Sequence, residues 1–242
     1  IDVGVTADGT TSLGKTVQLE GDVQAYDDGK VNLTLDGPDS YLQGNVQTEN
    51  PLNYGGTSTS GTVNLTVTKG ATWRPVYDNR YGTANKYQSS IEVHPQSYTF
   101  ADNSIDTLAL SNGGIVDLTW DNATRDPATA GRTLTITELS GEGGIFKINS
   151  NLTQNKADEI TLGENSTSTG VGIDVAYDPA LAAVNLTTAS STTGKALVLT
   201  DKSGKLTSVT GVADSYNLYD YTPTITANGD GTYSLTKLTI TN

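Results

Sequence analysis

The feature that most constrains the fold is a segment that occurs twice at a fixed distance. "GKVNLTLDGPDSY" (residues 29–41) matches "GTVNLTVTKGATW" (residues 61–73) at an offset of 32 residues, with Gly, Val-Asn-Leu-Thr and a terminal aromatic aligned. "VDLT" (116–119) and "VNLT" (184–187) are weaker echoes, which a Thr-rich β-protein produces readily. Identical strands are best placed on top of one another, where like side chains form continuous ladders. The repeat therefore favours a stacked solenoid over a sandwich, whose paired strands need not share a pattern.

Short runs of Val, Leu, Ile and Thr with polar residues at alternate positions recur along the chain and predict β-strands. Clusters such as "SNGG", "DKSGK" and "NGDGT" separate these runs and supply the positive φ angles that turns need. The expected strands include residues 31–35, 63–68, 114–120, 132–138, 144–149, 159–162, 216–221 and 232–240. With about 20 to 25 residues per coil, the chain would form about ten coils and a rod of about 50 Å.

Composition excludes several classes of protein. With 35% hydrophobic and only 17% charged residues, the 242-residue chain can bury a core and is not disordered. A formal net charge of −13 disfavours nucleic acids and anionic membrane surfaces as partners. No apolar run approaches the roughly 20 residues that span a bilayer. Cysteine is absent, which removes disulfides, thiolate metal ligands and cysteine nucleophiles. Because the chain starts at Ile1 and not at Met, we expect a fragment or a processed product.

An ordered series of motifs resembles a known family. The series consists of "VNLTVTKGATW", "IDTLALSNGGIVDL", "RTLTITELSGEGGIFKINSNL", "ADEITL" and "STGVGIDVAYD". It resembles the C-terminal part of autotransporter passenger domains of the pertactin-like and AIDA-like type, over about residues 63–235. "YNLYDY" and "GDGTYSL" resemble the last strands before the linker and membrane barrel of that family. The sequence departs from the pattern at Asn151, where an Asp is common, and at Tyr233, where a Trp is common.

In this family an "L-G-x-G-x-F" element is followed by an Asp and then by a small residue and Gly, and the resemblance rests on the ordered combination of these motifs. The matching residues here are Leu139, Gly141, Gly143, Gly144, Phe146, Asp158, Thr169 and Gly170. The glycines are expected to turn the backbone tightly and bring it close to a neighbouring coil, where a Cβ would clash. Phe146 is expected to point inward as a plug. A phosphate-binding Gly loop is disfavoured, because no helix N-terminus and no Lys-Ser/Thr pair follows.

The resemblance implies an all-β fold: a single-stranded right-handed parallel β-helix with a C-terminal β cap. Residues 1–138 would form coils with an irregular excursion near 74–104, and residues 139–242 an autochaperone-like cap that nucleates folding. The function implied is that of a non-enzymatic stalk and folding module of a bacterial adhesin-type surface protein. It would be extracellular, and attached through its own C-terminal membrane barrel or released. A β-sandwich surface module is the alternative fold.

The candidate binding residues lie in the longest segment that breaks the coil pattern: Trp73, Arg74, Tyr77, Tyr81 and Tyr87. Tyr and Arg outside a rigid scaffold are typical of adhesive or glycan-binding surfaces. The expected partners are a host or bacterial surface protein or glycan, with self-association as a further option. The alternative is that these side chains pack over the edge of their own core.

No catalytic residue, metal site or cofactor is predicted. His94 is the sole histidine, and no GxSxG element accompanies it. Paired carboxylates could serve a carbohydrate-active β-helix, the alternative function, and the candidates are Asp27, Asp28, Asp117, Asp121 and Asp126. Most acids, however, lie beside Gly or Asn in turns, where backbone geometry favours Asp. "DDG", "DGPD" and "NGDG" could bind calcium, but the RTX nonapeptide and the EF-hand loop are absent.

Overall fold

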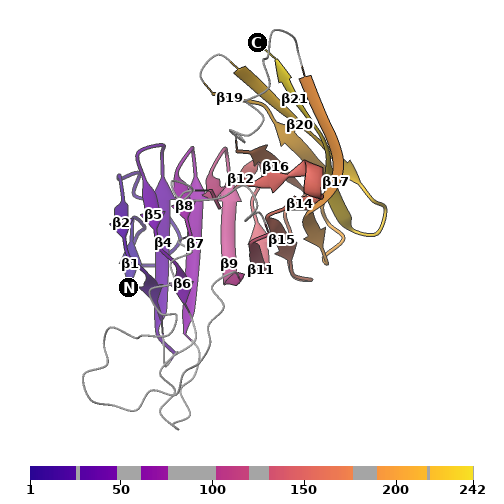
Figure 1. Cartoon of the computed structure of the whole chain (residues 1–242). Helices are drawn as coiled ribbons and strands as arrows, with labels where there is room; N and C mark the ends of the chain where they lie inside the picture. The colour runs from indigo at the N-terminus through magenta and orange to yellow at the C-terminus, as the bar shows by residue number, and fades with distance from the viewer. Residues whose placement is uncertain are drawn as a thin grey trace, which may run out of the picture.

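The computed structural model describes residues 1–25, 28–47, 61–75, 102–119, 131–176, 190–216 and 219–241. Within these residues the chain is all-β, and the helix that they contain is the short 3₁₀ helix η4 (Leu152–Gln154). The strands lie side by side from the N-terminus to a group of C-terminal hairpins at the other end (Figure 1). No helix in this part of the chain is long and apolar enough to cross a membrane.

Two large sheets contain most of the strands. The ten-stranded sheet has the order β1 (Asp2–Val3), β4 (Lys30–Asp36), β7 (Thr62–Thr68), β9 (Asp102–Ser111), β11 (Thr133–Ser140), β15 (Glu159–Leu162), β17 (Ser190–Asp201), β21 (Thr232–Thr241), β20 (Tyr219–Ala227) and β19 (Asp214–Tyr216). The seven-stranded sheet has the order β18 (Ser208–Val212), β16 (Gly170–Val175), β12 (Gly144–Ile148), β10 (Ile115–Asp117), β8 (Thr72–Arg74), β5 (Tyr41–Gln43) and β2 (Gln18–Glu20). Two small sheets pair β3 (Val23–Gln24) with β6 (Val46–Gln47), and β13 (Ser150–Asn151) with β14 (Lys156–Ala157).

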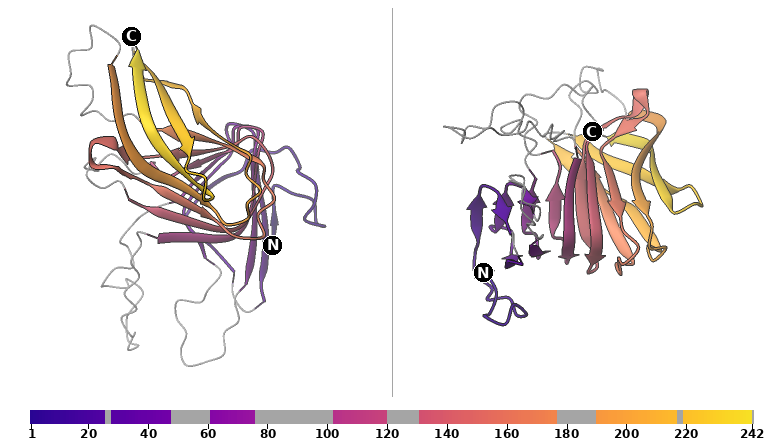
Figure 2. Two further views of the ribbon diagram at one scale, coloured as in Figure 1. Left: turned by 90° about the vertical axis from the view of Figure 1, so that its right-hand side faces the viewer. Right: turned by 90° about the horizontal axis from the view of Figure 1, so that it is seen from below.

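From β1 to β18 the chain alternates between the two large sheets, and within each sheet these strands pair in parallel. Each passage of the chain therefore adds one strand to each sheet, and we call each such passage a coil. The view from below shows the strands of successive coils in one row (Figure 2). This is the arrangement that a parallel β-helix requires.

The repeated segment forms adjacent strands in register, as the sequence predicts. In the β4–β7 pair, Val31 lies opposite Val63 and Leu33 opposite Leu65. The repeat aligns Tyr41 with Trp73, and this alignment is wrong. In the structure Trp73 pairs with Leu42, and Tyr41 pairs with Thr72. A shift of one residue moves a side chain to the other face of a sheet. Trp73 is therefore buried, whereas Tyr41 is only partly buried on the outer face.

The core is built from ladders of apolar side chains that run through successive coils. In the seven-stranded sheet one ladder contains Leu19, Leu42, Trp73, Val116, Phe146 and Ile173. In the ten-stranded sheet another contains Val3, Leu33, Leu65, Leu108 and Leu139. Each fully buried Leu or Phe side chain contributes about 1.5–3 kcal/mol to folding. Because the ladders are continuous, each coil stabilises its neighbours.

The coils are longer and fewer than the sequence predicts. The seven-stranded sheet has one strand per coil, so the described residues form seven coils and not about ten. Register partners are separated by 26 residues from Thr133 to Glu159, and by 43 residues from Thr68 to Ser111. The "VDLT" echo begins at Val116 in the seven-stranded sheet, whereas both copies of the repeat lie in the other sheet. That echo is therefore not part of the repeat.

Antiparallel hairpins follow the parallel coils. β17 pairs with β21, β21 with β20, and β20 with β19, all antiparallel. These strands extend away from the coils in the orange and yellow part of Figures 1 and 2. β20 passes close to β18, since a Cβ on Gly211 would lie 1.9 Å from the carbonyl oxygen of Pro223. The end of a parallel stack exposes unpaired strand edges, and these hairpins lie over that end.

Candidate functional site

The best-defined site in the described residues is the region where the coils meet the hairpins, which we call the junction. It comprises residues 139–176 and residues 206–216. It contains the glycine element, Phe146 and Asp158, which the sequence singles out, and a charged cluster that the sequence does not. Nowhere in the described residues do three or more His, Asp or Glu side chains form a group that could hold a metal ion.

The glycine element forms the turn between β11 and β12. Gly141 and Gly143 have φ angles of 90° and 72°, which L side chains rarely adopt. A Cβ on Gly144 would lie 2.3 Å from Cγ of Leu110, and one on Gly141 would lie 2.6 Å from the Leu110 carbonyl oxygen. Two of these glycines therefore lie against the preceding coil at a distance that no side chain allows.

Phe146 follows this turn and is completely buried. It pairs with Val116 on one side and with Ile173 on the other, so its ring lies within an apolar ladder. The alternation of β12 places Phe146 inside and its neighbours Ile145 and Lys147 on the other face. A charge at position 146 would have no solvent and no partner.

Asp158 is a buried carboxylate that joins three segments. Its Oδ1 accepts hydrogen bonds from the backbone N–H of Gly131 (3.2 Å) and of Arg132 (3.1 Å). Its Oδ2 accepts from the backbone N–H (2.8 Å) and the side-chain Nδ2 (2.9 Å) of Asn149. The residue is 0% exposed, so these bonds replace its hydration. Asp158 thereby fixes the start of β11, the end of β12 and the start of β15 relative to one another.

Charged side chains form a row on the outer face of the seven-stranded sheet. Asp117, Lys147 and Asp174 lie opposite one another on β10, β12 and β16. The Nζ of Lys147 lies 3.0 Å from Oδ2 of Asp174 and 3.1 Å from Oδ2 of Asp214. Asp214 belongs to β19, so Lys147 connects the coils to the hairpins.

Burial and ion pairing compete in this row, and burial decides the direction of the pKa shift only at Asp174. It raises the pKa of Asp174 despite the opposing effect of Lys147, and Asp214 and Asp117 add to the rise. Oδ1 of Asp174 is buried and has no hydrogen-bond partner. Burial alone would lower the pKa of Lys147, but the pull of Asp174 and Asp214 outweighs it and raises that pKa. Burial alone would raise the pKa of Asp214. The hydrogen bonds from Lys147 and from the Ser215 N–H together have the larger effect, so the pKa of Asp214 is lowered.

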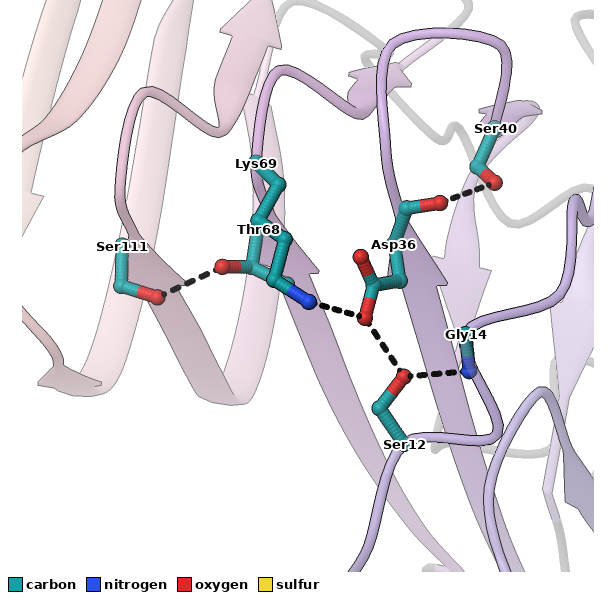
Figure 3. A network of polar contacts seen from close by, with 7 residues as sticks. All are labelled: Ser12, Gly14, Asp36, Ser40, Thr68, Lys69 and Ser111. Carbon is teal, nitrogen blue, oxygen red and sulfur yellow. Dashed lines mark hydrogen bonds and ion pairs between the residues drawn. The ribbon is translucent and has the colours of Figure 1, made fainter.

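A second polar network joins the N-terminal coils at the turns between the two sheets (Figure 3), and we call it the Asp36 network. Oδ2 of Asp36 accepts hydrogen bonds from Ser12 Oγ (2.7 Å) and Lys69 Nζ (2.9 Å). These contacts lower the pKa of Asp36, with Ser12 as the larger cause and Lys69 as the next. In the following coils, Thr68 Oγ1 and Ser111 Oγ are hydrogen-bonded at 3.0 Å.

The predicted binding residues are not brought together in the described structure. Trp73 is a core residue, 1% exposed, and its indole Nε1 donates to the Gly44 carbonyl oxygen at 3.0 Å. Arg74 is half-buried, and its guanidinium lies 4.9 Å from the ring centre of Tyr41. Tyr77, Tyr81 and Tyr87 lie outside the described residues, so a binding role for them stays a prediction.

Of the acids weighed for catalysis, Asp28 and Asp117 lie in the described residues, and they belong to different coils. Asp117 Oδ1 accepts hydrogen bonds from the Thr119 N–H (2.8 Å) and Oγ1 (2.6 Å), which is turn chemistry. Asp28 has a φ of 63° and lies in a turn. His94, Asp27, Asp121 and Asp126 lie outside the described residues. The "NGDG" segment forms the β20–β21 turn, where Asp230 Oδ1 accepts from the Thr232 N–H at 3.1 Å.

Sequence reasoning missed Lys147, Asp174 and Asp214. Each occupies an outward position of a short strand, where a charged residue is expected for solubility alone. Their meeting depends on the register between β12 and β16 and on the path of β19. The one available signal was an outward Lys in β12 and an outward Asp in β16, but it identifies no pair without the register.

Comparison with known proteins gives limited similarity. The chain matches no protein-family model and no curated protein sequence. Among solved structures it is similar to the crystal structure of the Hap adhesin of Haemophilus influenzae, with a TM-score of 0.39 and 19% sequence identity. The match covers 90% of this chain and 22% of the adhesin chain, so this chain spans less than a quarter of that protein's length.

Proposed function

We propose that this chain is a non-enzymatic stalk and folding module of a bacterial surface passenger protein, built as a single right-handed parallel β-helix. One observation carries the proposal: parallel coils stack in register and end under antiparallel hairpins. Such a stack is rigid along its length, because backbone hydrogen bonds and apolar ladders repeat in every coil. The ordered motifs that resemble autotransporter passengers agree with this role.

The stalk role follows from the way in which the coils are connected. Register is kept in the strands, while the number of residues between partners varies from 26 to 43 (Thr133 to Glu159, Thr68 to Ser111). The connections can therefore differ in length without disturbing the ladders, and binding segments are commonly placed on such connections. We place the contact with a host or bacterial surface protein or glycan there, with residues 74–104 as the first candidate.

The folding role is assigned to residues 139–242. In this part Asp158 fixes three segments, Phe146 continues the ladder, and the hairpins cover the last strands. A stack that starts from one stable end can add coils one at a time, since each new strand finds a formed edge. This end would lie next to the membrane barrel, and the stack would extend outward from the bacterial surface.

The test replaces one inward side chain. Phe146→Asp should prevent refolding of the full chain from urea within the time in which the wild type recovers protease resistance, because the charge is buried in the ladder. Thr135→Asp, at an exposed position of β11, is the matched control and should refold normally. Phe146→Leu keeps the apolar character and should refold with a small loss of stability. Wild-type refolding of Phe146→Asp would overturn the folding role.

A further inference from the structure

We propose that β19 is a salt-responsive strap that closes over the Lys147 row and opens while the coils and the remaining hairpins stay folded. The strap is residues 213–216. Its closed position is held by the contact of Asp214 with Lys147. This inference concerns local opening and is independent of what the chain binds at a cell surface.

In the described residues the strap is held by its pairing with β20, by a hydrogen bond from Ser215 Oγ to Asp220 Oδ1 (2.6 Å) and by the ion pair with Lys147. β19 has three residues, forms the last strand of the ten-stranded sheet and pairs with β20 alone. Ala213, Asp214 and Ser215 are all exposed, and the side chain of Asp214 is 49% exposed. A short edge strand with exposed side chains belongs to the part of a protein that opens most easily. The contact with Lys147 is therefore a large part of what keeps β19 against the coils.

The charges under the strap make closure finely balanced. One cation, Lys147, faces Asp117 on β10, Asp174 on β16 and Asp214 on β19. Closing the strap gives Lys147 a second carboxylate, but it brings Asp214 toward Asp174, and the two repel each other. Opening loses the ion pair, yet it relieves that repulsion.

Salt weakens the contact that favours the closed strap. The Lys147–Asp214 contact is partly exposed and is weakened when ionic strength rises, whereas the buried Asp174 contact is screened less. The β19–β20 pairing itself is neutral backbone hydrogen bonding and has no such dependence. Raising the salt concentration should therefore favour the open strap and leave the coil ladders unchanged.

The experiment is hydrogen–deuterium exchange of the full chain, read by mass spectrometry at low and at high sodium chloride. In the wild type, peptides that cover residues 213–221 should exchange about two to five times faster at high salt, which is the range expected for an exposed ion pair. Lys147→Met and Asp214→Asn should exchange at the faster rate at both salt concentrations. Lys147→Arg keeps the charge and should restore slow exchange and the salt response.

Two further variants separate the strap from general effects. Lys69→Met removes a comparable ion pair, 2.9 Å long, from the N-terminal coils and should leave exchange of residues 213–221 at the wild-type rate. Asp174→Asn removes the repulsion, so β19 should exchange more slowly than in the wild type while it keeps the salt response. Peptides from β7 and β9 report on folding of the coils in every variant.

The strap would be refuted by equal salt responses in wild type and Lys147→Met. It would also be refuted if opening at β19 were always accompanied by opening of the coils, because β19 would then be part of one cooperative unit. Exchange that is insensitive to salt in the wild type would have the same meaning.

Discussion

The Asp36 network and the Lys147 row show how the same geometry gives opposite electrostatics. Both bring charged side chains from successive coils together: Lys147 lies opposite Asp174 in the sheet, and Lys69 follows Thr68, the register partner of Asp36. At the N-terminal end one carboxylate receives two donors, and its pKa falls. At the junction one cation serves several carboxylates, and the most buried of these, Asp174, has a raised pKa. Two properties decide whether a row of charged side chains stabilises the stack. They are the ratio of hydrogen-bond donors to carboxylates and the burial of those carboxylates.

This difference gives Asp36 and Asp174 opposite responses to pH. The folded-state pKa of Asp36 is depressed, so its contribution is present at neutral pH and is lost as pH falls through that pKa. The folded-state pKa of Asp174 is raised, so its protonation favours the folded protein as pH falls through that pKa toward the unfolded value. The pKa of Asp214 is lowered like that of Asp36, so acid acts in two opposite directions at the Lys147 row and in one direction at the Asp36 network.

The largest effect is expected from Asp158, because no residue of the Asp36 network is so completely buried. Asp158→Ala leaves the N–H groups of Gly131, Arg132 and Asn149 without this acceptor and should cost about 3 kcal/mol. Urea unfolding monitored by circular dichroism measures the loss. Glu138→Ala, at an exposed position of β11, should change the stability by less than about 0.5 kcal/mol. Equal effects of the two variants would contradict the assignment of Asp158 as the residue that fixes the junction.

An intermediate effect is expected at Asp36. Asp36→Asn weakens the contacts with Ser12 and Lys69 and should cost about 1 kcal/mol at neutral pH. The wild type should lose this advantage below about pH 4, and the variant should show a flatter stability profile in that range. Thermal melts between pH 3 and pH 7 test the sign. A variant that is destabilised equally at all pH values would show that the charge of Asp36 is not what matters.

The smallest effect is expected at Lys69, whose side chain is 63% exposed. Lys69→Met removes the ion pair but leaves the Ser12 contact, so the loss should be below about 0.5 kcal/mol and should vanish at high salt. Lys147→Met at the junction should behave differently, because it leaves Asp174 and Asp214 facing each other. Identical urea midpoints for the two variants would remove the contrast between the two ends.

Much of the fold could be predicted from the repeat and the strand pattern. The 32-residue repeat gives the β4–β7 register directly, and residues 159–162 form β15 with the expected bounds. Both follow from local alternation and from identity between neighbours in the stack. The number of coils was wrong because the connections vary in length, and connection length leaves no periodic signal. Residues 216–221 were expected as one strand, but β19 ends at Tyr216 and β20 begins at Tyr219 in the opposite direction.

The candidate site also has a part that the sequence indicates and a part that it does not. The glycines, Phe146 and Asp158 were singled out by motif order, and the turn at Gly141 and Gly143 is a local feature that the sequence shows directly. Trp73 was included among the candidate binding residues because it lies beside the segment that breaks the coil pattern, whereas its pairing with Leu42 places it in the core. Lys147, Asp174 and Asp214 come from three strands, so only the tertiary structure brings them together.

The two sheets of one coil carry different offsets: Val31 to Val63 spans 32 residues, while Leu42 to Trp73 spans one fewer. The corner between the sheets is one residue shorter from Thr68 to Thr72 than from Asp36 to Tyr41, a difference that would invert every side chain of β8 if it fell inside the strand. Corners are thus where this architecture tolerates insertions and deletions, and strands are where it does not. Homologous chains should accordingly be aligned separately for each sheet, with gaps allowed at the corners. A single fixed period would assign inward positions wrongly in one of the two sheets.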